Sequence, residues 1–414
     1  MHQRHFSDNF AAQIILHPFM SASALLLTWK NPVFRNLFTF FAHPQSRAVG
    51  LVFAVDSLLF GSWVSHIPWV KEKLHLNDGQ LGLVLFAMPA GLFLMNPMTG
   101  FLIGRYGASK VTIWSGFAFA LAALLPINAP SVPLLAAGLF VLGMTGALLN
   151  VAMNTCATEV EQAFGQHIMS SCHGMWSLGG MLGAAGTGLA IWMGMHPSVH
   201  MLLISVLLLL IVSWVRADLS GIPKGEKAPA AKFGLAKPTP ALILMIITGL
   251  CIAMGEGLAF DWSAIYLKET AHASPEVAAL GFAGFAGAMT LGRFVGDTII
   301  PRWGGRLLLR IGAVIAAAGL LLAYYIPAPS AALAGFMMLG LGCSLGAPIL
   351  YAASMRLPGI PPATGLATYA TLSFMGFLAG PPLIGFVAQG YGLSYGLLGI
   401  AVLQMLAFFT AKKI

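Results

Sequence analysis

The segment GRYGASK at residues 104–110 is matched by PRWGGRL at residues 301–307, an offset of 197 residues. Nearly the same offset relates further positions in the two parts of the chain: Leu142-Gly143 and Leu339-Gly340, Ser177 and Ser373, Gly180 and Gly376, and Trp63 and Trp262. One register shared by several segments is typical of an internal repeat, whereas chance similarity between Gly/Ala-rich helices would not keep it. The sequence therefore predicts two similar halves.

The composition indicates that lipid is the main solvent of this chain. Of its 414 residues, 58% are hydrophobic and 8% are charged, and the mean hydropathy is +0.85. A soluble domain has about a quarter of its residues charged. In lipid the backbone must satisfy its own hydrogen bonds, so helices or a closed barrel are the possible structures. Long apolar runs without strict alternation favour helices.

Charge and cysteine usage exclude two other classes of protein. The net charge is +8, but no Lys/Arg-rich face of the kind that binds nucleic acid is present. The four cysteines lie inside apolar segments without metal-ligand spacing: Cys156, Cys172, Cys251 and Cys343. We therefore expect buried free thiols, no metal, no cofactor and no nucleic-acid partner.

The apolar runs predict an all-α membrane protein with twelve transmembrane helices, since a span needs about 20 apolar residues. These runs lie near residues 48–67, 79–103, 110–127, 132–156, 168–191, 198–215, 240–265, 276–299, 307–326, 330–355, 364–388 and 392–411. The expected organisation follows from them: 1–47 a cytoplasmic N-terminal extension, 48–216 an N-terminal six-helix bundle, 217–238 a cytoplasmic linker, and 239–411 a C-terminal six-helix bundle.

The distribution of basic residues predicts the orientation. With these spans, 17 of the 21 Lys and Arg residues lie on the side of the termini and the linker. The opposite side holds Lys71, Lys73 and Lys268, and Arg293 lies within a span. Because cytoplasmic loops carry the excess of Lys and Arg, both termini are expected in the cytoplasm.

Residues 1–47 are the least regular part of the chain. The stretch from Phe10 to Trp29 is apolar but interrupted by Gln13, His17 and Pro18. It has neither a basic n-region nor a small-residue cleavage site, so no signal peptide is predicted. An interfacial segment or sequence upstream of the true start is the favoured interpretation, and a further span is the alternative.

The segment GFLIGRYGASK at residues 100–110 resembles the signature between helices 2 and 3 of the major facilitator superfamily. Gly100, Arg105, Gly107 and Lys110 match the signature, and Gly104 replaces its Asp. The second copy offers Arg302, Gly304 and Arg306, with Pro301 in the acidic place. The resemblance implies a transporter of two pseudo-symmetric six-helix bundles. The basic residues are either gating residues or topological anchors at the lipid headgroups.

Two pairs of motifs narrow this resemblance. The chain is similar to the fucose/sugar-permease-like branch and its uncharacterised bacterial inner-membrane relatives in two places. These are NVAMN (150–154) with HGMWSLGG (173–180), and GEGLAFDW (255–262) with GRFVGD (292–297). The fucose-permease pattern has a Glu, a candidate proton carrier, where this chain has Asn150. An amide does not titrate, so the resemblance does not supply the proton carrier.

Ionisable residues inside the predicted spans are functional candidates, because each costs about 2.5–3.5 kcal/mol at the bilayer centre. Asp56 in the first span and Glu256 in the seventh lie at similar depths. Burial favours the protonated form of a carboxyl group, as a proton carrier requires. Glu256 is the leading candidate for proton coupling, with Asp56 and His173 as the others. Structural pairing of the acids, and packing of His173, are the alternatives.

The remaining candidates are polar or aromatic residues in the same spans. Arg293 and Asp297 are spaced i, i+4, which predicts a structural ion pair on one helix face. Candidates for contact with a solute lie inside the predicted spans: Asn150, Asn154, Trp176, Asp261 and Trp262. The amides are equally suited to hydrogen bonds between helices. Asp261 is suited to a gate or to an interfacial position.

We therefore expect a secondary active transporter that moves a small polar solute by alternating access coupled to protons, and the resemblance implies a sugar-like solute. No G-x-x-x-x-G-K-[ST] loop for ATP is present, and no nucleophile–base pair suggests an enzyme. Efflux of drugs or metabolites, and a non-transporting sensor or scaffold, are the alternatives. The expected partners are the solute, protons and the bilayer, and the chain is expected to be a monomer in a bacterial inner membrane.

Overall fold

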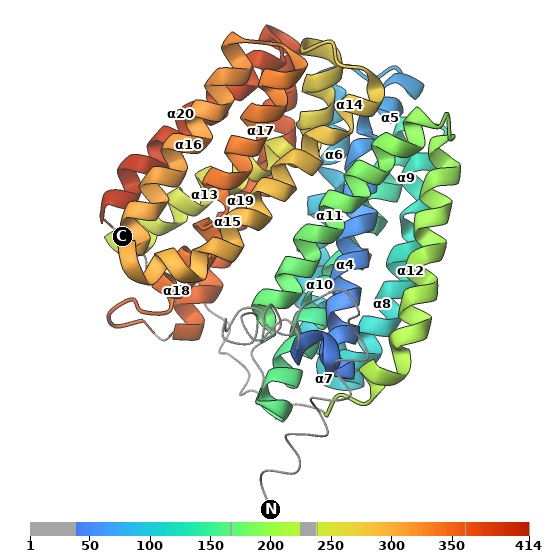
Figure 1. The fold of residues 1–414 in the computed structure, drawn as a ribbon, viewed down its shortest axis with the longest axis vertical. Helices are drawn as coiled ribbons and strands as arrows, with labels where there is room; N and C mark the ends of the chain where they lie inside the picture. Colours follow the sequence, from blue (N-terminus) through green and yellow to red (C-terminus); the bar gives the residue numbers. More distant parts are fainter. Residues whose placement is uncertain (1–38, 166–167, 224–236, 238, 361, 414) are drawn as a thin grey trace, which may run out of the picture.

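The computed structural model describes residues 39–165, 168–223, 237, 239–360 and 362–413, and the regular elements in this part of the chain are all helical (Figure 1). The first half comprises α4 (Pro44–Ser65), α5 (Ile67–Lys73), α6 (Asp78–Leu85), α7 (Ala87–Tyr106), α8 (Ala108–Ala122), α9 (Leu124–Asn128), α10 (Val132–Phe164), α11 (Met169–Trp192) and α12 (Pro197–Ser220). Most of the expected N-terminal extension and of the linker lies outside the described residues.

The second half repeats this arrangement. It comprises α13 (Pro240–Ile265), the π-helical turn η1 (Tyr266–Thr270), α14 (Pro275–Ala278), α15 (Leu280–Trp303), α16 (Gly305–Tyr325), α17 (Pro329–Cys343), α18 (Gly346–Ser354), α19 (Pro362–Tyr391), α20 (Leu393–Thr410) and the short η2 (Ala411–Lys413). Within the described residues, ten helical stretches are long and apolar enough to cross a bilayer. With α11 and α15, each 24 residues long, all twelve predicted spans coincide with helices.

Several predicted spans are divided between consecutive helices in the structure, and proline explains two of these breaks. The span 79–103 divides after Leu85, and the span 330–355 divides at Ser344. Pro89 lies four residues after Leu85, and Pro348 lies four residues after Ser344. Because proline has no backbone N–H, it cannot donate the helical hydrogen bond to the carbonyl group four positions earlier. The helix hydrogen bonding is therefore interrupted at these two places.

A third span is longer than predicted. α10 continues to Phe164, beyond the expected end at residue 156, and ends at Gly165, whose φ of 64° is easily adopted by glycine. The Glu161 carboxylate accepts hydrogen bonds from the backbone N–H groups of Ile168 and Met169, at 2.7 and 2.9 Å. Polar residues continued the helix beyond the apolar run, and Glu161 caps the first turn of α11.

The two halves pack their helices in equivalent pairs. In the first half α4 packs against α11, α7 against α10, and α8 against α12; in the second the pairs are α13 with α19, α15 with α17, and α16 with α20. Gly179 and Gly183 of α11 lie against the backbone oxygens of Ala54 and Leu58, leaving no room for a Cβ atom. This spacing of small residues allows the close approach of α11 to α4.

The halves contact each other mainly through α11 with α15 and α6 with α19. At the second contact Gly82 lies against the Pro381 carbonyl group and the Gly385 Cα atom, so the two backbones touch. Figure 1 shows that the halves adjoin at the end of the molecule with α5, α6 and α14, and diverge toward the end with α18. We call these the α5 end and the α18 end.

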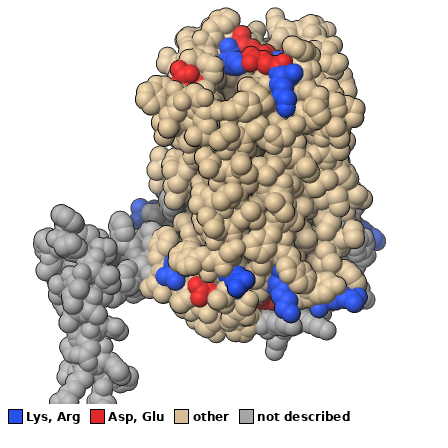
Figure 2. Space-filling view, turned by 90° about the vertical axis from the view of Figure 1, so that its right-hand side faces the viewer, with Lys and Arg blue, Asp and Glu red and all other residues tan. Residues whose placement is uncertain are grey.

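Charged side chains mark the two ends of the molecule. In the view of Figure 2 a wide middle band has no charged surface, acidic and basic residues lie together at the α5 end, and basic residues predominate at the α18 end. An uncharged belt between two charged rims is what a bilayer requires of the surface that it covers.

Candidate functional site

Asp56 and Trp176, predicted separately, lie together in the first half. The Trp176 indole N–H donates to Asp56 Oδ2 at 3.0 Å, and Asp56 is 7% exposed. A buried carboxyl group requires a hydrogen-bond partner, and the indole of the neighbouring helix supplies it. Because α4 and α11 pack closely through Gly179 and Gly183, this bond is internal to one half.

Arg293 reaches from the second half to the first. Its Nη1 atom donates to Ser177 Oγ at 3.1 Å, joining α15 to α11. Ser177 is the neighbour of Trp176 and is 2% exposed. The predicted pairing of Arg293 with Asp297 stays a prediction, because the Asp297 side chain lies outside the described residues. The described contact instead connects the two halves.

Glu256 and His173 lie within electrostatic range of Arg293, one from each half. Glu256 is half-buried in α13. His173 of α11 meets the ring of Phe53 edge-on, with centroids 5.5 Å apart. Arg293 is thus the centre of a polar group that includes a carboxyl, an imidazole and a hydroxyl, and Asp56 is bonded to Trp176, the chain neighbour of Ser177. The name central cluster is used below for Asp56, His173, Trp176, Ser177, Glu256 and Arg293.

Asn150 and Asn154 lie on α10 at one helical turn from each other. The Asn154 side-chain amide donates to the Asn150 backbone oxygen at 2.8 Å, so one of its donors serves its own helix. Asn150 is exposed, and its side chain is therefore the more available of the two amides.

Asp261 and Trp262 differ in their surroundings although they are adjacent in α13. Trp262 is fully buried, and its Nε1 atom has no hydrogen-bond acceptor among the described residues. Asp261 is half-buried. In this conformation Trp262 is a core residue, so of the two only Asp261 is accessible to a solute.

A layer of phenylalanines lies between the halves. Phe60 of α4 meets Phe260 of α13 and Phe282 of α15, with centroids 5.5 and 6.2 Å apart. Phe260 also contacts Phe285 and Phe377, at 5.8 and 5.7 Å. The rings pack mostly edge to face, which is favourable for aromatic pairs. This phenylalanine layer joins residues from both halves into one apolar contact.

The residues of the signature segment lie at the α18 end. Gly107 and Gly304 turn the chain into α8 and α16 with φ of 89° and 77°, a region that favours glycine. Arg105, Lys110 and Arg302 are exposed, and the Arg105 guanidinium lies 5.5 Å from the Tyr106 ring. A Cβ atom on Gly100 would meet nothing within 4 Å. Neither the gating nor the anchoring interpretation is tested by these contacts.

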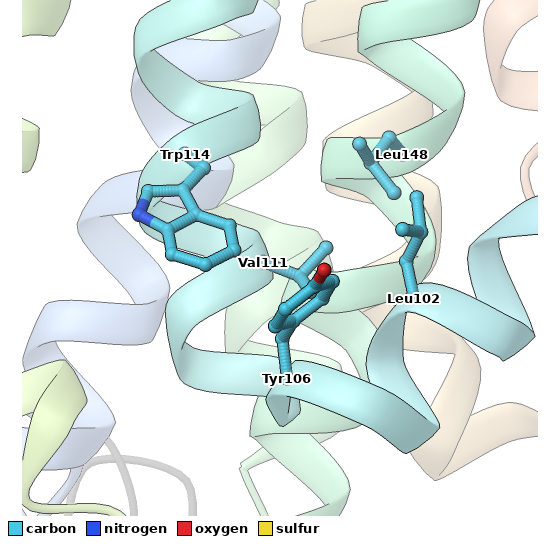
Figure 3. A pocket seen from close by; sticks show the side chains of 5 residues that line it. All are labelled: Leu102, Tyr106, Val111, Trp114 and Leu148. Carbon is cyan, nitrogen blue, oxygen red and sulfur yellow. The ribbon is translucent and has the colours of Figure 1, made fainter.

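A shallow hollow lies beside this segment. It has a volume of about 220 Å³, and Figure 3 shows the side chains around it: Leu102, Tyr106, Val111, Trp114 and Leu148. They come from α7, α8 and α10 of one half, and Trp114 is 52% exposed. The apolar lining suits contact with lipid, and none of the charged candidates lies in it.

Sequence analysis missed a set of ion pairs at the α5 end. Lys71-Glu72 and Lys268-Glu269 are related by the offset of 197 residues, and each Lys contacts the Glu of the other half. Extending the repeat to charged positions would have found them.

Comparison with known proteins identifies the family. A family model described as Major Facilitator Superfamily matches residues 49–364. An uncharacterised MFS-type transporter of Yersinia pestis is 33% identical over 375 residues, covering 89% of this chain and 96% of that protein. An uncharacterised transporter of Sinorhizobium fredii is 32% identical, covering 83% and 91%. The membrane protein MosC of Rhizobium meliloti is 29% identical, covering 88% and 90%.

Solved structures show the same fold at low sequence identity. A bacterial homologue of the human lysosomal transporter Spinster, inward-facing and occupied, has a TM-score of 0.70 at 14% identity, covering 88% of this chain and 94% of that one. The Escherichia coli fucose:proton symporter FucP has a TM-score of 0.59 at 18% identity, covering 90% and 98%. The predicted fold is confirmed, as is the prediction of a transporter and not an enzyme. This chain belongs to the Major Facilitator Superfamily.

Proposed function

We propose that this integral membrane transporter moves a small polar solute by alternating access, coupled to protons through Glu256, with Asp56 as the second candidate. The observation that carries the proposal is Arg293, which joins the halves through Ser177 while its charge acts on Glu256. A group that binds or releases a proton at this place changes how the halves are held together. Acids inside membrane proteins are costly to keep, which supports a functional role.

The proton steps follow from the charges of the central cluster. The Glu256 carboxylate attracts the Arg293 guanidinium; when Glu256 takes up a proton from one side of the membrane, this attraction is lost. Arg293 is then free to donate its N–H groups to a solute. Release of the proton to the other side restores the attraction and completes the cycle. His173, which also lies near Arg293, is positioned to exchange protons with the cluster.

The polar groups around the centre support a hydroxyl-bearing solute. Arg293 and Asn150 offer donors, while the carboxyl groups of Asp56, Glu256 and Asp261 offer acceptors and Trp176 offers an aromatic face. Sugars and related polyols present both donors and acceptors next to apolar ring faces. The fold similarity to a fucose:proton symporter agrees with this chemistry, without assigning the solute.

Efflux of amphipathic compounds by the same fold is the second candidate. The phenylalanine layer between the halves is the observation that favours it, because aromatic rings from both halves offer apolar contact area. The charged residues beside it favour the polar solute.

We also propose that the α18 end and both termini face the cytoplasm of a bacterial inner membrane, with residues 48–216 and 239–411 as the two bundles. The support is the excess of Lys and Arg on the side of the termini and the linker. Basic residues at the α18 end in Figure 2 agree with it. Labelling of single cysteines at Ala163 and Ser274 in intact cells would test the orientation, since only the second is then expected to react from outside.

Proton flux in proteoliposomes tests the function directly. The wild type, Glu256→Gln, Asp56→Asn and the control Asp218→Asn are challenged with sugars, sugar acids, polyols and cationic drugs. Asp218 is a carboxylate at the end of α12, paired only loosely with Arg47 at 3.9 Å, so its variant controls for the loss of one charge. A solute that drives proton flux in the wild type and control, but not in Glu256→Gln, supports the proposal. Solute movement with unchanged proton flux in both site variants overturns the assignment of the carriers.

A further inference from the structure

The repeat places a Lys-Glu dipeptide at the same position of each half. Lys71-Glu72 lies near the end of α5, and Lys268-Glu269 lies in η1, 197 residues later. An aromatic and an aliphatic residue precede each dipeptide: Trp69-Val70 in one half and Tyr266-Leu267 in the other. The four charges therefore descend from one duplicated segment, and the fold brings its two copies together at the α5 end.

The contacts between the copies are reciprocal. Lys71 Nζ lies 2.6 Å from both carboxylate oxygens of Glu269, and Lys268 Nζ lies 2.7 Å from Glu72 Oε1. Each Lys thus pairs with the Glu of the opposite half. Each pair joins the first half to the second, so both must separate if the halves move apart at this end.

The two pairs differ in burial. The Lys71 side chain is 10% exposed and also contacts Asp78 of α6 at 2.6 Å, whereas the Glu72 side chain is 59% exposed. Burial disfavours the Lys71 ammonium group, but its hydrogen bonds to Asp78 and Glu269 outweigh this effect and raise its pKa above the ordinary value. Exposed ion pairs contribute little to stability, whereas the stability of a buried charge depends strongly on its partners. The Lys71–Glu269 pair is therefore the stronger of the two.

The ion pairs lie over a closed interface. Ser65, at the end of α4, is 4% exposed and donates to the Ala279 carbonyl of the second half at 3.2 Å. The phenylalanine layer and the Gly82–Gly385 contact also join the halves. These contacts are neutral, so the ion pairs are the part of the closure with direct electrostatic control.

We propose that the duplicated Lys-Glu dipeptides form an ionic gate that holds the α5 end closed and must open during transport. The proposal rests on alternating access as the proposed mode of transport, but not on the solute or on protons. It assigns roles in transport to Lys71, Glu72, Lys268 and Glu269. Asp78 keeps Lys71 paired when the halves separate, so the buried ammonium group is not left without a partner.

A cysteine at Ser65 reports the state of the gate. Ser65→Cys is close in size, and modification of its thiol by a water-soluble maleimide is measured in purified protein in nanodiscs, where both faces are accessible. The four native cysteines are buried; the parent protein gives their background, and their continued protection shows that a variant is folded. Ser274→Cys, on an exposed residue of the same end, controls for the reactivity of the reagent.

Charge reversal and charge exchange then test the pairs. Lys268→Glu is expected to raise the rate of Ser65→Cys modification about tenfold, because it places two carboxylates opposite each other. Adding Glu72→Lys is expected to return the rate to within about twofold of the parent, since the exchanged pair again attracts. The matched control is Lys73→Glu, whose residue contacts Trp69 and the Ile127 carbonyl within the first half; it is expected to leave the rate unchanged.

The buried Lys71–Glu269 pair provides a second test of the gate. Glu269→Gln removes one carboxylate without introducing repulsion, and a rise of about threefold is expected because Lys71 keeps Asp78. This variant serves if Lys268→Glu does not fold. Equal rates in Lys268→Glu, Glu269→Gln and Lys73→Glu would overturn the gate, as would an exchanged pair that reacts as fast as the single reversal. Loss of proton flux with an intact modification pattern would instead count against the proposed coupling alone.

Discussion

At the α5 end the two halves place the same residues opposite each other, whereas at the centre they place different ones. Lys71-Glu72 and Lys268-Glu269 are copies that pair reciprocally. At the centre, Asp56 is held by Trp176 of its own half, while Arg293 of the second half reaches across to Ser177. A symmetric contact suits a closure that both halves share, and asymmetric chemistry suits a bound solute. The repeat thus pairs identical charged residues at the α5 end and places different polar residues together at the centre.

The largest expected effect separates the two central acids. Glu256→Gln is expected to lower solute-driven proton flux by at least about 100-fold, the usual size of the loss of a proton-transfer group. Asp56→Asn is expected to cost about tenfold or less, because the amide oxygen still accepts the Trp176 N–H. The measurement is dye-reported flux in proteoliposomes at equal protein density. A greater loss in Asp56→Asn than in Glu256→Gln would reverse the comparison.

The next effect concerns the residue that crosses the interface. Arg293→Gln is expected to lower the flux about 30-fold, and Arg293→Lys about tenfold, since lysine keeps the charge but not the planar set of donors. A rise in the solute KM with little change in maximal rate in Arg293→Lys would indicate that the donors bind solute. Full activity in Arg293→Gln would remove Arg293 from the mechanism.

A smaller effect tests whether Asp56 is held within its half. Trp176→Phe is expected to lower the free energy of unfolding by about 1–3 kcal/mol, because it leaves a buried carboxyl group without its donor. Combined with Asp56→Asn, the loss should be less than the sum of the two. Trp192→Phe on the same helix, where the side chain is 73% exposed, is the control. Thermal unfolding in detergent measures the four proteins of this cycle and the control, and strict additivity would show that the two residues act independently.

The smallest effect is the pH dependence of the ionic gate. The pKa of Lys71 is raised above its ordinary value of 10.5, so closure favours the charged ammonium group. The stabilising contribution is therefore complete below pH 10.5 and is lost as the pH rises through the raised pKa. Conformational opening, followed by a fluorophore on the exposed Ser274→Cys of the same end, should stay flat from neutral pH to about pH 10 and increase above it. The same increase in Lys71→Met would assign it to another group.

Sequence analysis predicted the helices well because each span is a continuous apolar run, which depends on local composition. It missed the breaks at Leu85 and Ser344, although Pro89 and Pro348 give a local reason for them. It also ended α10 too early, since Glu161 and its neighbours look like a loop until the capping of Ile168 and Met169 is seen.

The candidate site was less predictable because its contacts join distant residues. Asp56 and Trp176 were each predicted, but their hydrogen bond spans 120 positions. Local spacing suggested Asp297 as the partner of Arg293, whereas the described partner, Ser177, is 116 positions away. The ion pairs are an intermediate case, because the repeat relates the four residues but only the fold shows that each pairs with the opposite copy.

The contact of Gly82 with Gly385 has a consequence for how fast the α5 end opens. Where α6 and α19 meet through the backbones of Gly82 and Gly385, no interlocking side chain has to be withdrawn before the two helices part. This contact is therefore expected to add little to the activation barrier for opening, and the ion pairs beside it are expected to set most of that barrier. Gly385→Leu would place a side chain between the two helices. The opening rate measured by Ser65→Cys modification should then change even with every ion pair in place.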